Sequence, residues 1–150
     1  GHSRTLLPGR DAEGTRVIDV TGFPDTTRLL LAADALVTDY SSVMFDFSAT
    51  GKPMYFLVPD IEHYRGELRG FYFDLEAHAP GPVARTRDEL LAALRSDTTE
   101  VYAERYAERY AHWQAKFNAH DDGHASRRVV KRLFAAGFID ANPRGSETGA

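Results

Sequence analysis

The stretch that decides the fold is Leu29–Asp60, which reads LLLAADALVTDYSSVMFDFSATGKPMYFLVPD. It contains two short apolar runs, Ala35–Thr38 and Met54–Val58, that have the length and composition of strands buried on both faces. Val43–Ala49 between them has the length of a helix, and Gly51 is a suitable residue to end it. Because such strands alternate with helices in parallel sheets, the stretch predicts an α/β fold, with a parallel sheet flanked by helices.

The pattern continues upstream of this stretch. The β-branched run Val17–Val20 predicts a short strand, and Asp25 is a plausible N-cap for a helix that reaches Ala33. Residues 1–15 are rich in Gly, Arg and Ser, which indicates a loop. Strand, helix, strand, helix and strand therefore follow one another between residues 17 and 58, as expected of repeated βα units.

Downstream, residues 59–82 are expected to form one irregular connection, and loops of that length in compact domains are commonly functional. Thr86 and Glu89 form a capping box that predicts the start of the next helix. Residues 99–117 contain the run YAERYAERYAHW, in which an aromatic residue recurs at every fourth position. That spacing places the rings on one side of a helix, which favours core packing over a ligand site.

A last helix is predicted from Ala125 to Ala136. Its basic residues lie mostly on one side and are Arg127, Arg128, Lys131 and Arg132. A solvated face that complements the helix dipole is the simplest interpretation, and contact with an anionic membrane is the alternative. Residues 141–150 are rich in Pro, Gly, Ser and Thr and are expected to be a disordered tail, which leaves residues 1–140 as the folded domain.

The composition limits the classes of function. With 150 residues the chain is expected to form one hydrophobic core, because chains near this size bury roughly 68–70% of their unfolded surface. A formal charge of −4 argues against wholesale binding of nucleic acid. The absence of cysteine excludes disulfides, zinc–thiolate sites and a cysteine nucleophile, and it fits the reducing cytoplasm. The chain begins with Gly1 rather than with Met, which suggests a piece of a longer protein.

The strongest local signal for chemistry is the segment Asp39–Ser42, which lies between a predicted strand and a predicted helix. Ligands of open parallel sheets bind beyond the carboxyl ends of the strands, and backbone N–H groups at a helix start attract phosphate. Ser41 and Ser42 add hydroxyl donors, and Asp46 could accept hydrogen bonds from ribose hydroxyls. Asp and Ser are also the usual N-caps of helices, so capping is the alternative for the turn and a solvated acid is the alternative for Asp46.

Several motifs in a fixed order resemble the CDP-glycerol glycerophosphotransferase family, the teichoic acid polymerases and primases of GT-B fold. The motifs are TDYSS (38–42), FDF (45–47), YR (64–65), RGFYFD (69–74), PGP (80–82) and DGHAS (122–126). The resemblance covers about residues 1–138, which is nearly the whole chain. It implies a Rossmann-like domain that forms the C-terminal half of a GT-B fold and binds the donor CDP-glycerol.

The resemblance also implies roles for individual residues. Ser41 and Ser42, together with Asp39 and Asp46, would contact the donor, with the two serines at its diphosphate. Members of the family transfer glycerol phosphate from CDP-glycerol to a hydroxyl of a lipid-linked acceptor and release CMP. The alternative within the same fold is a glycosyltransferase or epimerase that uses a UDP- or GDP-sugar. A third possibility is a nucleotide-binding module without catalytic activity.

Three further residues are assigned from the same resemblance. His2 falls where the family has a histidine near the donor phosphates, where it would stabilise charge that develops on the leaving CMP, and a remnant of cloning is the alternative for His2. Arg65 and Arg69 would pair with the diphosphate, because guanidinium groups bind phosphate in bidentate fashion. For Arg69 the alternative is an ion pair with Asp74 or Glu76 that holds the loop.

The implied partners are CDP-glycerol or CMP and a lipid-linked polyol phosphate acceptor, the latter held by a preceding domain that carries the general base. Peripheral association of the full-length protein with the cytoplasmic face of the membrane is expected from the same resemblance, and nucleic acid is not an expected partner. We predict no cofactor and no metal-ligating residue, because the sequence contains no dedicated carboxylate cluster, and we leave open whether the diphosphate recruits Mg²⁺.

Overall fold

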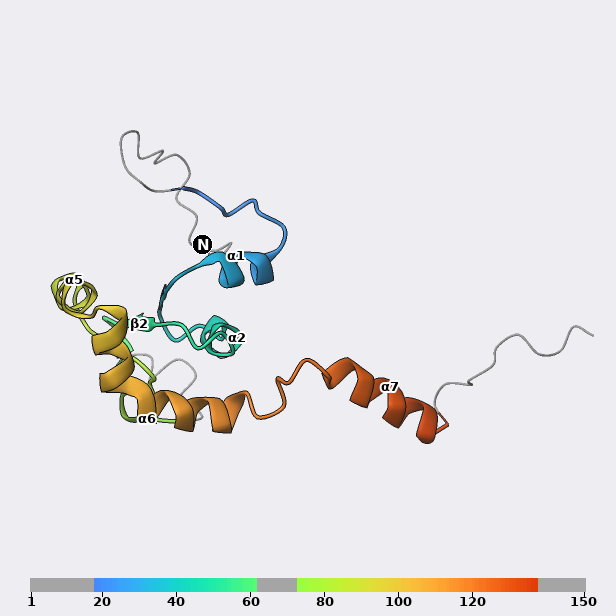
Figure 1. The fold of residues 1–150 in the computed structure, drawn as a ribbon. Helices are drawn as coiled ribbons and strands as arrows, with labels where there is room; N and C mark the ends of the chain where they lie inside the picture. The colour runs from blue at the N-terminus through green and yellow to red at the C-terminus, as the bar shows by residue number, and fades with distance from the viewer. Residues whose placement is uncertain (1–17, 62–72, 138–150) are drawn as a thin grey trace, which may run out of the picture. The chain divides into compact units, whose positions relative to one another are not determined.

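The computed structural model describes residues 18–61 and 73–137. The chain divides into two compact units, Gly1–Ala33 and Asp34–Ala150, and each is described by itself (Figure 1). Within the described parts of the chain, no helix is both long enough and apolar enough to span a bilayer.

In the first unit, helix α1 comprises Thr26–Ala32 and begins as predicted, since the Asp25 side chain accepts a hydrogen bond of 3.1 Å from the backbone N–H of Arg28. The strand predicted for Val17–Val20 is wrong for its described part, Ile18–Val20, which has no strand structure. Here the Asp19 carboxylate accepts a hydrogen bond from its near neighbour's N–H at 2.8 Å. Such a local turn competes with strand pairing, and it overrides the β-branched composition.

The second unit is built on a sheet of three parallel strands in the order β1-β2-β3. The strands are β1 (Leu36–Thr38), β2 (Met54–Leu57) and β3 (Val83–Ala84). In register, Val37 lies opposite Tyr55 in the first pair of strands. This arrangement confirms the α/β prediction of a parallel sheet with flanking helices.

The two strands that were predicted differ in burial. The central strand β2 is buried at its first three residues, as expected of a strand covered on both faces. The prediction is wrong for β1, where the Val37 side chain is 48% exposed. The difference follows from position, because β1 is an edge of this sheet and β2 is paired on both sides. Strand β3 was not predicted, since two residues carry no periodic signal.

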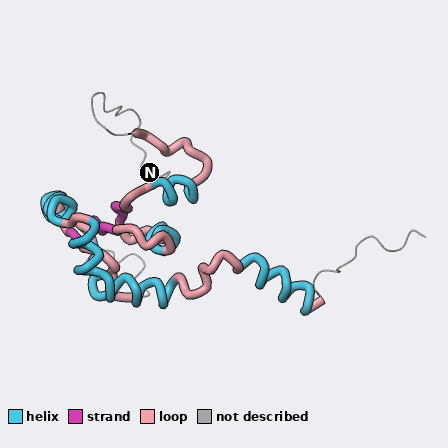
Figure 2. The backbone as a smooth tube through the Cα atoms, viewed as in Figure 1, coloured by secondary structure: helices cyan, strands magenta, loops and turns pink. Residues whose placement is uncertain are grey.

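The helices of this unit are α2 (Val43–Ser48), α4 (Leu75–His78), α5 (Arg87–Ser96), α6 (Thr99–Phe117) and α7 (Ala125–Ala135), shown in cyan in Figure 2. Both halves of the predicted capping box at the start of α5 are present. Helix α4 corrects the expectation that residues 59–82 are irregular throughout. It forms because the Asp74 side chain caps its first turn, accepting a 3.2 Å bond from the N–H of Ala77.

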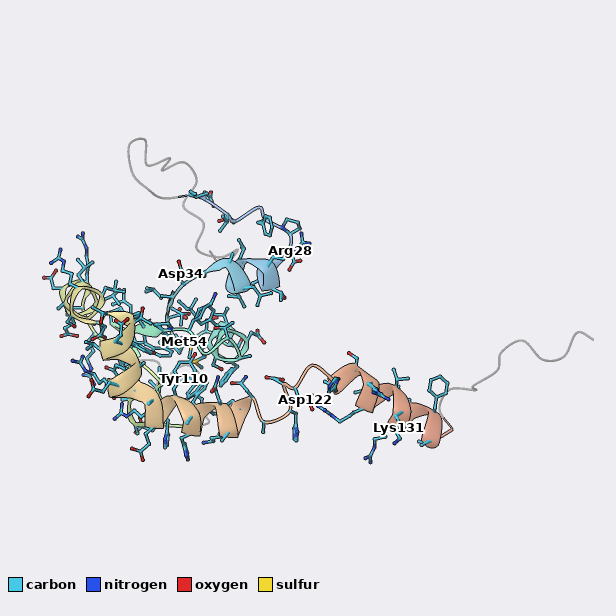
Figure 3. The ribbon with its side chains drawn as sticks, in the orientation of Figure 1. Arg28, Asp34, Met54, Tyr110, Asp122 and Lys131 are labelled. Atoms are coloured by element: carbon cyan, nitrogen blue, oxygen red, sulfur yellow. The ribbon has the colours of Figure 1, made fainter. Side chains whose placement is uncertain are left out.

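The aromatic stripe on α6 packs into the core, as its spacing predicted. Tyr102, Tyr110 and Trp113 are each at most 8% exposed, whereas Tyr106 is half-buried. Met54 on β2 and Tyr110 on α6 are both labelled in Figure 3, at the part of the unit where helix and sheet meet. Helix α6 is therefore the main support of the sheet, and it leaves the opposite ends of the strands to the loops.

Candidate functional site

The carboxyl ends of the three strands meet at one edge of the sheet, because all three are parallel. Three segments leave this edge: 39–42 after β1, 58–61 after β2 and 85–86 after β3. Ligands of open parallel sheets bind at such an edge. It is therefore the place to examine the residues that the sequence singles out.

The turn Asp39–Ser42 is held by its own side chains. Asp39 Oδ1 accepts a hydrogen bond of 2.7 Å from the backbone N–H of Ser41, and Ser41 Oγ lies 3.5 Å from the N–H of Val43. Ser42 stands at the N-cap position of α2, but its side chain makes no capping hydrogen bond. Capping therefore does not account for the hydroxyl of Ser42, which is exposed at the edge of the sheet.

A hydrogen bond joins this turn to the segment after β2. The Tyr40 hydroxyl donates to Asp60 Oδ1 at 2.7 Å. Sequence reasoning missed this contact, although a signal exists: Asp60 follows the buried strand β2 just as Asp39 follows β1. The bond is short and involves a carboxylate, which makes it stronger than a bond between neutral groups. It fixes the relative position of two of the three segments.

Asp46 lies in the first turn of α2 and is exposed. Helix α2 has only six residues, so its dipole is a weaker attraction for phosphate than that of a full-length helix. The side chains and N–H groups of the turn are thus the main polar groups that the described part of this segment offers to a ligand.

Arg85 begins the third segment and was also missed by sequence reasoning. Its guanidinium donates to Glu76 Oε1 at 2.8 Å, and its backbone N–H donates to Glu89 Oε2 at 2.7 Å. Without knowledge of β3, nothing in the sequence places Arg85 at the carboxyl edge. The contact also bears on Arg69, because Glu76, one of its two suggested partners, is engaged by Arg85.

The remaining predicted site residues, His2, Arg65 and Arg69, lie outside the described residues. Among the residues that the structure does describe, no group of three or more His, Asp or Glu side chains is arranged to hold a metal ion. Four predicted residues are thus placed: Asp39, Ser41 and Ser42 in one turn and Asp46 on the helix that follows it.

An aromatic cluster supports this turn from behind. The Phe45 ring of α2 stacks on Trp113 of α6, with ring centroids 5.5 Å apart and planes 10° apart, and lies 4.8 Å from the ring of Phe117. Phe73, from the GFYFD motif, meets the Trp113 ring edge-on at 5.4 Å. The motif residues are therefore brought together in space, although they lie far apart in the sequence.

The larger hollows of the described surface lie elsewhere. An apolar groove of about 270 Å³ runs along α6 beside Gly51 and Pro53, at the amino end of β2. A second, between α4 and α6, contains His78 and His112. Neither is lined by a residue predicted to bind the donor, so the assignment of the site depends on the turn and on relatives rather than on cavity size.

The family model described as CDP-Glycerol:Poly(glycerophosphate) glycerophosphotransferase matches residues 5–135. This chain belongs to that family. The relatives include the teichoic acid poly(glycerol phosphate) polymerase of Bacillus subtilis, 41% identical over 118 residues, and the teichoic acid glycerol-phosphate transferase of Staphylococcus aureus, 42% identical over 120 residues. Each alignment covers 79% of this chain, but only 16% and 30% of those proteins. The chain thus spans less than a third of these relatives.

Solved structures agree with the sequence comparison. The wall teichoic acid polymerase TagF, a GT-B type enzyme, matches 79% of this chain and 29% of its own chain, with a TM-score of 0.68 and 34% identity. A TagF variant soaked with CDPG matches with a TM-score of 0.67 over the same shares. A teichoic acid poly(ribitol-phosphate) polymerase of Bacillus spizizenii is also 36% identical over 116 residues, so similarity alone does not choose between glycerol and ribitol.

Proposed function

We propose that this chain supplies the donor-binding site of a CDP-glycerol glycerophosphotransferase in the synthesis of teichoic-acid-type polymers. The observation that carries the proposal is the turn Asp39–Ser42 at the carboxyl end of β1, in a chain whose family match spans residues 5–135. The Ser42 hydroxyl, which makes no capping bond, is available to a ligand at an edge where parallel sheets bind nucleotides.

In the proposed reaction, an acceptor hydroxyl attacks the β-phosphorus of CDP-glycerol. A new P–O bond forms to the acceptor, the bond between the two phosphoryl groups breaks, and CMP leaves with its electron pair. Ser41 and Ser42 hold the diphosphate through hydroxyl and backbone donors, and Asp46 accepts from the ribose hydroxyls. His2, Arg65 and Arg69 balance the charge that develops on CMP.

The acceptor belongs to the proposal as well. It is a lipid-linked polyol phosphate, and the proton of its attacking hydroxyl passes to a histidine base of a preceding domain. Such an acceptor places the complete protein at the cytoplasmic face of the membrane. The similarity to both glycerol- and ribitol-phosphate polymerases supports the class of reaction and leaves either alcohol as the transferred group.

Isothermal titration calorimetry tests the proposal directly. The chain should bind CDP-glycerol, should bind it more tightly than UDP-glucose, and should release it when CMP is added in excess. A preference for UDP-glucose would instead identify a sugar transferase. A folded chain that binds neither ligand would identify an interaction module.

The double substitution Ser41→Ala/Ser42→Ala tests the residues. We expect CDP-glycerol affinity to fall at least about tenfold, because each lost hydrogen bond to a charged group contributes roughly 1.5–3 kcal/mol. The free energy of unfolding should change by less than about 0.5 kcal/mol, as for most exposed sites. Ser96→Ala, on the exposed end of α5, is the matched control. Unchanged affinity in the double variant would show that the serines have only a structural role.

A further inference from the structure

Helix α2 carries the turn Asp39–Ser42, yet it is too short to hold its own position. It has six residues, and isolated helices shorter than about 12–15 residues are marginal in water. Its inner side is fixed by burial of Met44 and Phe47. Its end presents backbone carbonyls that have no partner within the helix, and these must be satisfied from outside.

The last turn of α6 provides these partners. Asn118 Nδ2 donates to the carbonyl oxygen of Phe45 at 3.0 Å, and Gln114 Nε2 donates to the carbonyl oxygen of Ser48 at 2.8 Å. The Ser48 hydroxyl lies 2.7 Å from Asn118 Oδ1 and 2.8 Å from the carbonyl oxygen of Phe45, so its single hydrogen serves one of the two at a time. Because Ser48 is fully buried, these contacts are shielded from water at that residue.

Asn118 also reaches a third segment of the chain. Its Nδ2 donates to Asp121 Oδ2 at 2.8 Å, so both hydrogens of the amide are used. Asp121 belongs to the segment that leads into α7, and the next residue, Asp122, forms an ion pair with Arg128 of α7. One side chain thus joins α2, the end of α6 and the connection to α7.

The carbonyl that Asn118 binds lies one turn from the serines. The N–H of Met44 donates to the Ser41 carbonyl at 3.2 Å, and the N–H of Phe45 donates to the Ser42 carbonyl at 3.0 Å. The ring of Phe45 stacks on Trp113. A displacement of the Phe45 peptide therefore moves the backbone of both serines and changes the surroundings of the single tryptophan.

We propose that Asn118 is a positioning residue for the turn Asp39–Ser42. It acts through the Phe45 carbonyl to set the position of α2, and through Asp121 it ties that position to the segment before α7. The geometric part concerns the described contacts alone. Its consequence for CDP-glycerol rests on the proposed function, and the two parts are tested by separate measurements.

Two variants separate positioning from a general loss of stability. Asn118→Asp replaces the donating amide by a carboxylate that faces both the Phe45 carbonyl and the carboxylate of Asp121. The double variant Asn118→Asp/Asp121→Asn restores an amide–carboxylate pair with the roles exchanged, but the Phe45 carbonyl still lacks its donor. If the charged variants fail to fold, Asn118→Ala removes both bonds without adding charge. Ala115→Ser, on the exposed side of the same turn of α6, is the control.

The first measurement uses no ligand. Amide hydrogen exchange should be about tenfold faster at Met44 and Phe45 in both charged variants, and unchanged at Phe56, whose N–H is bonded to Pro82 in the sheet. Trp113 emission should shift in both variants as well. The free energy of unfolding should recover in the double variant only. Recovery of exchange together with stability would show that Asn118 has a merely structural role and would overturn the proposal.

The second measurement is the affinity for CDP-glycerol. We expect it to fall about five- to tenfold in Asn118→Asp and to stay low in the double variant, in spite of its recovered stability. Affinity equal to that of the unsubstituted chain in all variants would overturn the proposal. If the unsubstituted chain does not bind CDP-glycerol at all, the proposed function fails, while hydrogen exchange still decides whether Asn118 positions the turn.

Discussion

The two ends of the three-stranded sheet use their polar groups in opposite ways. At the amino end, the buried Tyr102 hydroxyl accepts from the N–H of Met54 at 3.0 Å and lies 2.6 Å from the carbonyl oxygen of Pro80, to which it donates. The Tyr110 hydroxyl donates to the Lys52 carbonyl at 2.7 Å. Here the side chains of α6 satisfy buried backbone groups, and the strands are held tightly.

At the carboxyl end, the printed contacts are between exposed groups, such as Tyr40 with Asp60 and Asp39 with the N–H of Ser41. These bonds shape a turn, but they leave polar side chains at the surface where a ligand can reach them. The difference teaches that one end of the sheet provides stability, so that the other end can keep exposed groups for binding. Substitutions at the two ends should therefore affect different properties.

The largest loss of stability is expected from Gly81→Ala at the amino end. A Cβ at this position would lie 1.9 Å from the carbonyl oxygen of Met54 and 2.7 Å from the Tyr102 hydroxyl, so the backbone must move. We expect the free energy of unfolding to fall by about 3 kcal/mol or more, as for severe overpacking. Urea denaturation measures it, with Gly22→Ala as the control, because nothing lies within 4 Å of a Cβ there. Equal stability of the two variants would contradict the close packing of this end.

Tyr102→Phe should have the next largest effect. The substitution keeps the ring but removes the hydroxyl, which leaves the N–H of Met54 and the carbonyl of Pro80 buried without that partner. Such a loss costs roughly 1–3 kcal/mol. Tyr106→Phe, one turn along the same helix at a half-buried position, is the matched control and should change stability by less than about 0.5 kcal/mol. Similar losses in both variants would show that the buried hydroxyl is not special.

The amino end should also weaken at alkaline pH. Burial raises the pKa of Tyr102 and of Tyr110 above the ordinary value of 10.0. A group with a raised pKa in the folded state stabilises the fold fully below its unfolded pKa, and this stability is lost as pH rises toward the folded value. We expect a loss of about 1 kcal/mol between pH 10 and pH 11, measured by urea denaturation across that range. The double variant Tyr102→Phe/Tyr110→Phe should show a flatter profile, and an unchanged slope would refute the assignment.

The smallest change in stability is expected from Tyr40→Phe at the carboxyl end. It removes the hydrogen bond of 2.7 Å to Asp60, but both partners are near water, which replaces the bond. We therefore expect a loss of about 0.5 kcal/mol in urea denaturation. A loss above about 1.5 kcal/mol would show that this end is held as firmly as the amino end. Asp60→Asn, which keeps an acceptor for the hydroxyl, should be smaller still.

Local sequence signals predicted much of this fold because they act within a few residues. The capping box at Thr86 and Glu89, the helix start at Asp25 and the aromatic stripe of α6 all depend on neighbours one turn away, and each is present. The same applies to the segment Asp39–Ser42, whose place after a strand and before a helix was read from the order of apolar and polar residues.

Other features depend on partners far along the chain, and the sequence did not predict them. The exposure of Val37 follows from the edge position of β1, and the strand β3 exists only because it pairs with β2. The contact of Tyr40 with Asp60 spans 20 residues, and that of Asn118 with Phe45 spans 73. No periodicity or motif reports such pairs.

The sequence by itself therefore determined the family, the alternation of strands and helices, and the segment proposed to meet the donor phosphates. Only the tertiary structure decided which strand is buried, how α6 holds the amino end of the sheet, and which side chain fixes α2. The physical reason is range. Caps, turns and periodic faces are set by residues within a turn or two, whereas burial and hydrogen bonds between segments exist only after the chain has brought distant residues together.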